Sequence, residues 1–92
     1  MRIQLAPKLV KKLKKQDVRL RKSFKKAIDL FTDNPDHPHL NNHELQRELK
    51  GYRSIDITSD WRGIYQEITE ETEEPLAYFV DLGKHRELYK TN

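Results

Sequence analysis

Apolar residues in the first third of the chain recur at helical spacing. Leu9, Val10 and Leu13 lie on one side of a segment that begins at Pro7, and proline suits the first turn of a helix because its missing N–H needs no partner there. Asp17 is typical of a helix N-cap. The second apolar set follows the spacing i, i+4, i+7, i+8, i+11, at Leu20, Phe24, Ala27, Ile28 and Phe31. The pattern predicts either a helical hairpin with its second helix capped by Asp17, or a single bent helix.

The spacing changes to alternation in the second half. Residues 52–58 (YRSIDIT), 61–68 (WRGIYQEI) and 76–82 (LAYFVDL) therefore predict three consecutive antiparallel strands. Residues 2–6 (RIQLA) alternate in the same way and predict a short first strand. A segment rich in Asn, Asp and Pro at residues 32–43 (TDNPDHPHLNNH) ends the helical region.

This order of elements predicts an α+β domain. We expect the N-terminal strand and the helical hairpin to pack on a mainly antiparallel four-stranded sheet. The opposite sheet face stays partly open, and a short C-terminal helix starts near His85. A length of 92 residues leaves room for one domain, residues 1–92.

Charge is divided unevenly along the chain, although the net charge is only +3. Residues 8–26 contain ten lysines and arginines against one acid, whereas residues 66–74 (QEITEETEE) contain five glutamates and no base. Such a positive pole attracts polyanions such as nucleic acid, or an acidic protein. A lysine-rich helix face that is simply solvated is the alternative.

Several classes of protein and site are not expected. The chain has no cysteine, hence no disulfide, and no apolar run near the roughly 20 residues that span a bilayer. Its first residues lack the apolar core of a signal peptide, so we expect a cytoplasmic protein without a membrane partner. His37 and His39 flank a proline but match no zinc pattern, and no glycine-rich phosphate loop is present. We expect neither a metal site nor a cofactor.

Histidines and cations near the strand ends suit RNA chemistry. Metal-independent RNA cleavage needs a base for the ribose 2′-OH, cations for the phosphoryl oxygens and an acid for the leaving 5′-oxygen. Histidine serves as acid or base near neutral pH, and arginine binds phosphate through a fork of donors. The candidates on neighbouring strands of a meander are His43, Lys50, Arg53, Arg62 and His85, with Tyr52, Trp61 and Tyr89 able to stack on bases. Alternatively, His85 is a surface residue at a helix start, the two arginines pair with acids, and the aromatic residues pack in the core.

Two motifs carry a resemblance to a known family. Residues 40–67 (L..HEL..ELKGYRSIDITSDWRGIYQE) and 78–89 (YFVDLGKHRELY) resemble the RelE/ParE superfamily of bacterial toxins, most closely its YafQ-like and RelE-like mRNA interferases. The resemblance implies the toxin of a type II toxin–antitoxin system, a ribosome-dependent endoribonuclease that cuts message in the ribosomal A site. It further implies an antitoxin partner, and contact with operator DNA only through the toxin–antitoxin complex.

The resemblance also assigns roles to individual residues. His85 stands where YafQ-like enzymes have their principal catalytic histidine, and Arg62 where RelE has the strand arginine that contacts the scissile phosphate. His43, Asp60 and Tyr89 match further catalytic positions. Trp61, which with Asp60 matches an Asp-Trp pair of the YafQ-like site, is expected to bind substrate together with Arg53, Lys50, Asp56 and Asp81. The residues implied to contact ribosomal RNA lie on the basic helices and are Lys11, Lys12, Lys14, Lys15, Arg19 and Lys22.

Two positions depart from the YafQ-like pattern. Asp56 stands in place of a second histidine, and Asp81 in place of an arginine. Two carboxylates lower the positive potential where an RNA phosphate must lie, unless Arg62 and Arg53 compensate or Asp56 itself acts as a base. Two alternatives stay open: a ParE-like toxin that inhibits DNA gyrase without cutting, and a degenerate member that only binds its antitoxin.

Overall fold

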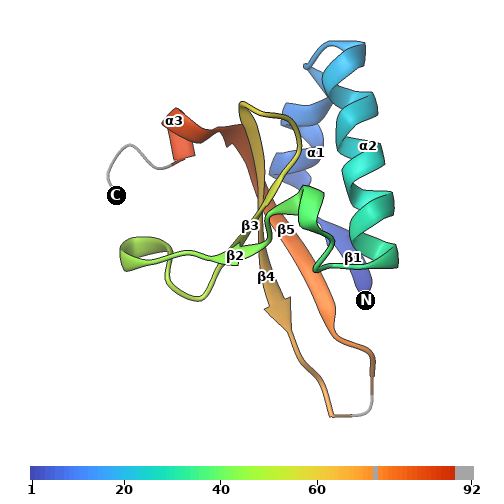
Figure 1. Cartoon of the computed structure of the whole chain (residues 1–92), viewed down its shortest axis with the longest axis vertical. Coiled ribbons are helices and arrows are strands. Elements are labelled where there is room, and N and C mark those ends of the chain that lie inside the picture. Colours follow the sequence, from blue (N-terminus) through green and yellow to red (C-terminus); the bar gives the residue numbers. More distant parts are fainter. Residues whose placement is uncertain (72, 89–92) are drawn as a thin grey trace.

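The computed structural model describes residues 1–71 and 73–88 (Figure 1). The predicted α+β class is confirmed, and the elements follow the expected order. They are β1 (Arg2–Leu5), α1 (Pro7–Lys14), α2 (Val18–Asp33), a 3₁₀ turn η1 (Pro38–Leu40), β2 (His43–Glu44), a second 3₁₀ turn η2 (Arg47–Leu49), β3 (Arg53–Asp56), β4 (Trp61–Ile68), β5 (Leu76–Lys84) and α3 (His85–Leu88).

The two alternatives for the helical region are resolved in favour of the hairpin. The Asp17 side chain accepts a hydrogen bond of 2.9 Å from the Leu20 N–H, which satisfies one of the free donors at the start of α2. Figure 1 shows α1 and α2 side by side on one face of the sheet, with α3 and the segment around β2 on the other side.

The sheet has five strands in the order β1-β5-β4-β3-β2, one more than expected. The additional strand is β2, whose two residues pair with Ser54 and Arg53 in β3. A two-residue strand has no apolar alternation of its own, so only its partner strand defines it. β1 pairs with β5 in parallel, and all other strand pairs are antiparallel.

The core lies between the helices and one face of the sheet. Phe31 of α2 meets Tyr65 and Phe79 edge to face, with ring centroids 5.0 and 5.5 Å apart. The opposite face, which we call the open face, carries the side chains of β3 and β4 that alternate with the core residues, including Asp56 and Arg62.

A β-bulge decides which β5 side chains reach the open face. Tyr65 pairs with Phe79 and Ile64 pairs with Asp81, so Val80 has no partner residue in β4. Strict alternation would place Asp81 on the core face together with Phe79. The extra residue turns Asp81 to the open face instead, the kind of re-aiming for which bulges are used near functional sites.

The edge of β5 is covered in two ways. β1 pairs with it only as far as Phe79, and α1 packs along the part that follows. Gly83 permits the close packing of α3, because a Cβ there would lie 3.1 Å from the Leu88 side chain, and the Lys12 Nζ of α1 would be 3.3 Å from that Cβ. The Lys12 ammonium therefore reaches the edge of the open face. None of the helices in the described part of the chain is long and apolar enough to cross a membrane.

Candidate active site

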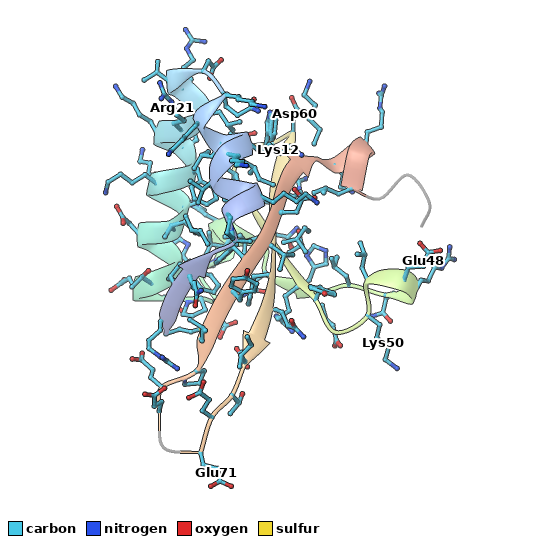
Figure 2. All side chains as sticks on the ribbon, turned by 180° about the vertical axis from the view of Figure 1, so that it is seen from behind. Lys12, Arg21, Glu48, Lys50, Asp60 and Glu71 are labelled. Carbon is cyan, nitrogen blue, oxygen red and sulfur yellow. The ribbon has the colours of Figure 1, made fainter. Side chains whose placement is uncertain are left out.

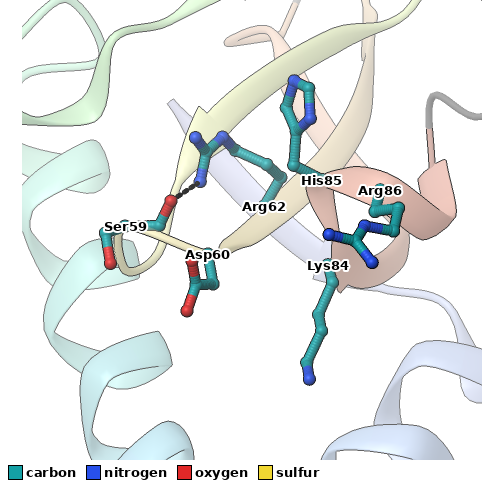
Figure 3. A pocket seen from close by; sticks show the side chains of 6 residues that line it. All are labelled: Ser59, Asp60, Arg62, Lys84, His85 and Arg86. Atoms are coloured by element: carbon teal, nitrogen blue, oxygen red, sulfur yellow. Dashed lines mark hydrogen bonds between the residues drawn. The ribbon is translucent and has the colours of Figure 1, made fainter.

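A polar pocket of about 640 Å³ lies where β4 begins and β5 ends (Figure 3). It is lined by Ser59, Asp60, Arg62, Lys84, His85 and Arg86. The β3–β4 turn and the start of α3 are joined by a hydrogen bond of 2.9 Å from the His85 N–H to the Asp60 carbonyl. This bond joins main-chain atoms, and it holds His85 beside the turn.

The Arg62 guanidinium is held in one position. Its Nη1 donates to the carbonyls of Thr58 and Ser59 at 3.0 Å each and to that of Trp61 at 3.2 Å. Its Nε lies 2.9 Å from the Asp56 carboxylate, an ion pair in which the Arg62 side chain is 15% and the Asp56 side chain 27% exposed. Within residues 1–71 and 73–88, the Arg62 Nη2 has no hydrogen-bond partner. One edge of a fixed cation is thus left for an anion.

Figure 3 shows the His85 imidazole and the Arg62 guanidinium on the same side of the strand ends, and the Lys84 ammonium and Asp60 carboxylate on the other. The register agrees with this, since Arg62 pairs with Gly83 whereas Lys84 pairs with Trp61. Asp60 therefore contributes its main chain to the positioning of His85, while its carboxylate points away.

Asp81, two residues before Gly83 on β5, contacts two cations of α1. Its carboxylate lies 3.7 Å from the Lys8 Nζ and 3.6 Å from the Lys12 Nζ, and it accepts a hydrogen bond of 2.8 Å from the Leu82 N–H. Lys12, expected only among ribosome contacts, therefore also lies at the edge of the site. Asp81 does not contact Arg62, so its negative charge is balanced locally.

Several predicted site residues lie elsewhere. Arg53 is on the core face, where its Nε donates to Asn42 Oδ1 at 2.9 Å. Trp61 packs against the core. His43 is on the open face but on the edge strand, where it is exposed and its Nδ1 lies 2.8 Å from the Asn41 carbonyl. Lys50 is exposed in the turn before β3, and its side chain points away from the sheet (Figure 2). Tyr89 falls outside the described residues.

Asn42 ties Arg53 to the core. Its Nδ2 donates to the Tyr65 hydroxyl at 2.8 Å and to the Pro35 carbonyl at 3.0 Å, while its Oδ1 accepts from Arg53. Burial raises the pKa of Tyr65 above its ordinary value despite the hydrogen bond to Asn42. The network holds the segment after α2 against β3 and β4.

We expect Asn42→Ala to lower the free energy of unfolding by about 1–3 kcal/mol, because the Tyr65 hydroxyl and the Arg53 Nε–H would both lose this partner. Urea unfolding of the variant measures the loss. Gln46→Ala, an exposed polar residue of the same region, is the control and should change stability by less than about 0.5 kcal/mol. Equal stability of both variants would show that the network is not structural.

Two cations of the pocket had not been predicted, Lys84 and Arg86. Both flank His85 in the motif GKHREL, so the signal was the local density of basic residues around the histidine assigned the principal catalytic role. In the described part of the chain, no three His, Cys, Asp or Glu side chains are gathered as a metal site.

Comparison with known proteins identifies relatives over nearly the whole chain. Residues 3–90 match the family model described as the bacterial toxin of type II toxin–antitoxin systems, YafQ. The structure is similar to YafQ from E. coli strain BL21(DE3), at 26% identity and a TM-score of 0.73, over 97% of this chain and 99% of that one. A search by sequence among curated proteins gave no match.

Two further solved structures share the fold. The YoeB/ParE toxin from Agrobacterium tumefaciens has 17% identity and a TM-score of 0.73, covering 92% of this chain and 99% of its own. The E. coli DinJ–YafQ complex contains a chain with 24% identity and a TM-score of 0.61, covering 97% of this chain and 99% of its own.

Proposed function

This chain belongs to the YafQ family of bacterial type II toxins, and we propose that it is an endoribonuclease that cuts messenger RNA on the ribosome. The observation that carries the proposal is the placement of His85 and Arg62 on the same side of one pocket. An acid–base group beside a fixed phosphate-binding cation provides one of the two proton transfers and the charge stabilisation that metal-independent RNA cleavage needs.

The reaction is a transfer of the phosphoryl group within the RNA. The ribose 2′-oxygen attacks the adjacent phosphorus, its proton passes to a base, and the 5′-oxygen leaves after receiving a proton, so that a 2′,3′-cyclic phosphate and a 5′-hydroxyl are formed. His85 serves in one of the two proton transfers. The Arg62 Nη2 and the neighbouring Arg86 balance the charge on the phosphoryl oxygens.

The partners follow from charge and from relatives. The basic helices would bind ribosomal RNA phosphates in the cytoplasm, where translation takes place. A cognate antitoxin would neutralise the toxin, as the DinJ–YafQ complex of a relative supports. Contact with operator DNA would arise only through that complex.

The same fold also occurs in toxins described as ParE, so the target has to be tested. After induction in a growing culture, we expect incorporation of labelled amino acids to fall before plasmid supercoiling changes. A change in supercoiling that precedes the loss of translation would identify gyrase as the target instead and overturn the proposal.

Asp56 should restrain phosphate binding at Arg62. We expect Asp56→Asn to strengthen the apparent affinity for ribosome-bound message by roughly three- to tenfold, because the negative charge that competes with phosphate for the Arg62 guanidinium is removed. Cleavage rates at varied ribosome concentration measure the change, and Asp36→Asn, at an exposed carboxylate in the loop after α2, is the matched control. A large fall in the rate at saturation would instead mean that Asp56 acts as a base.

A further inference from the structure

A second cleft of about 470 Å³ lies on the open face, beside the pocket of His85 and Arg62. Its apolar lining comes from Leu49, Ile64, Val80 and Leu88, with Tyr52 from the segment between η2 and β3. Carboxylates of Asp81 and Glu48 and the Lys8 ammonium provide its polar groups. A concave site that combines a tyrosine ring and apolar side chains with several polar groups suits a flat ligand with polar edges.

The cleft and the pocket are neighbouring parts of one surface. Ile64 and Arg62 are two residues apart on β4, and their partners on β5 are Asp81 and Gly83. Two residues along a strand span roughly 7 Å. A phosphate held at Arg62 therefore leaves the base of an adjacent nucleotide within reach of the cleft.

We propose that this cleft holds the nucleobase next to the scissile phosphate, and that Asp81 selects bases with an exocyclic amino group. The inference rests on the proposed function. Tyr52 and the apolar side chains offer a surface for a base, and a carboxylate accepts hydrogen bonds from amino groups. Uracil has no amino group and is the base that Asp81 disfavours.

The surroundings of Asp81 explain how a carboxylate tolerates RNA there. Lys8 and Lys12 lie within 4 Å of it, so the local charge is not negative, and the Leu82 N–H fixes the orientation of Oδ1. The bulge at Val80 is what brings this side chain to the open face. A positioned acceptor between two cations discriminates among bases without repelling their phosphates.

The test is the base composition around mapped cleavage sites. For the wild type we expect one position beside the cut at which adenine, cytosine and guanine each exceed uracil by roughly tenfold, after correction for the base composition of the message. In Asp81→Asn, whose amide also donates, this preference should disappear, while Asp36→Asn should retain it. Cuts with the same base frequencies in wild type and Asp81→Asn would overturn the inference and leave the proposed function intact.

If no cleavage sites are found, the binding of nucleotides to the cleft tests the inference. Titration of His85→Ala with each of the four nucleoside monophosphates should shift the amide resonances of Tyr52 and Asp81, with UMP weakest by roughly tenfold. Asp81→Asn, introduced into the same His85→Ala background, should bind all four nucleotides alike. Shifts that avoid these residues, or equal binding of all four before the Asp81 change, would overturn the inference.

Discussion

Replacement of His85 by alanine is expected to lower the rate of cleavage of ribosome-bound message by roughly 10²- to 10⁴-fold, the usual contribution of a positioned acid–base group. His85 is exposed in the pocket, and the alanine variant keeps the main-chain N–H that donates to the Asp60 carbonyl. The variant should therefore keep its fold. Single-turnover cleavage of a defined message on purified ribosomes measures the effect.

The control is His39→Ala, which removes an exposed imidazole from η1, outside the pocket. It should cleave at the wild-type rate. Both variants should keep the wild-type circular dichroism spectrum and bind the antitoxin, so that a loss of activity is assigned to chemistry. A His85→Ala protein that is folded and still cleaves within about threefold of the wild-type rate would remove His85 from the mechanism.

Charge reversal on α1 should have the second large effect. Lys8, Lys11, Lys12 and Lys15 line a shallow groove along this helix. Lys8 and Lys12 also contact Asp81, so Lys11 and Lys15 are the pair to change without disturbing the site. We expect the double change of Lys11 and Lys15 to Glu to weaken ribosome binding by roughly 10- to 100-fold at physiological salt, because two phosphate contacts are replaced by repulsion.

The measurement is co-sedimentation with ribosomes over a range of salt concentrations. The slope of log affinity against log salt should fall by roughly two for the α1 variant. Lys25 and Lys26 changed together to Glu alter the net charge equally on the exposed side of α2 and should leave the slope nearly unchanged. Equal weakening by both variants would mean that only net charge matters and that α1 is not a specific docking surface.

Local signals in the sequence were sufficient for most of the fold. The Asp17 cap and the apolar spacing of α2 are signals that lie within the helix that they predict. Alternation of apolar and polar residues predicted β3, β4 and β5 in the same way. The strand β2 depends on pairing with β3, and its two residues carry no pattern that predicts it.

The candidate site was predictable only in part, because several of its contacts depend on how strands pair and not on a local sequence pattern. The roles of His85 and Arg62 came from resemblance, and the structure brings both into one pocket. The expectation that Arg53 lies with them is not met, because alternation along β3 puts it on the core face. The contact of Arg62 with Asp56 depends on the register of two strands, and the direction of Asp81 on a bulge that alternation does not reveal.

The most direct test of the central claim is to map the 5′ ends of a defined message after incubation with the purified toxin, with and without ribosomes translating it. The account predicts cuts inside codons only when ribosomes are present, with 5′-hydroxyl ends on the downstream fragments. Cuts of equal number on naked message, or none on translated message from a folded protein, would contradict it.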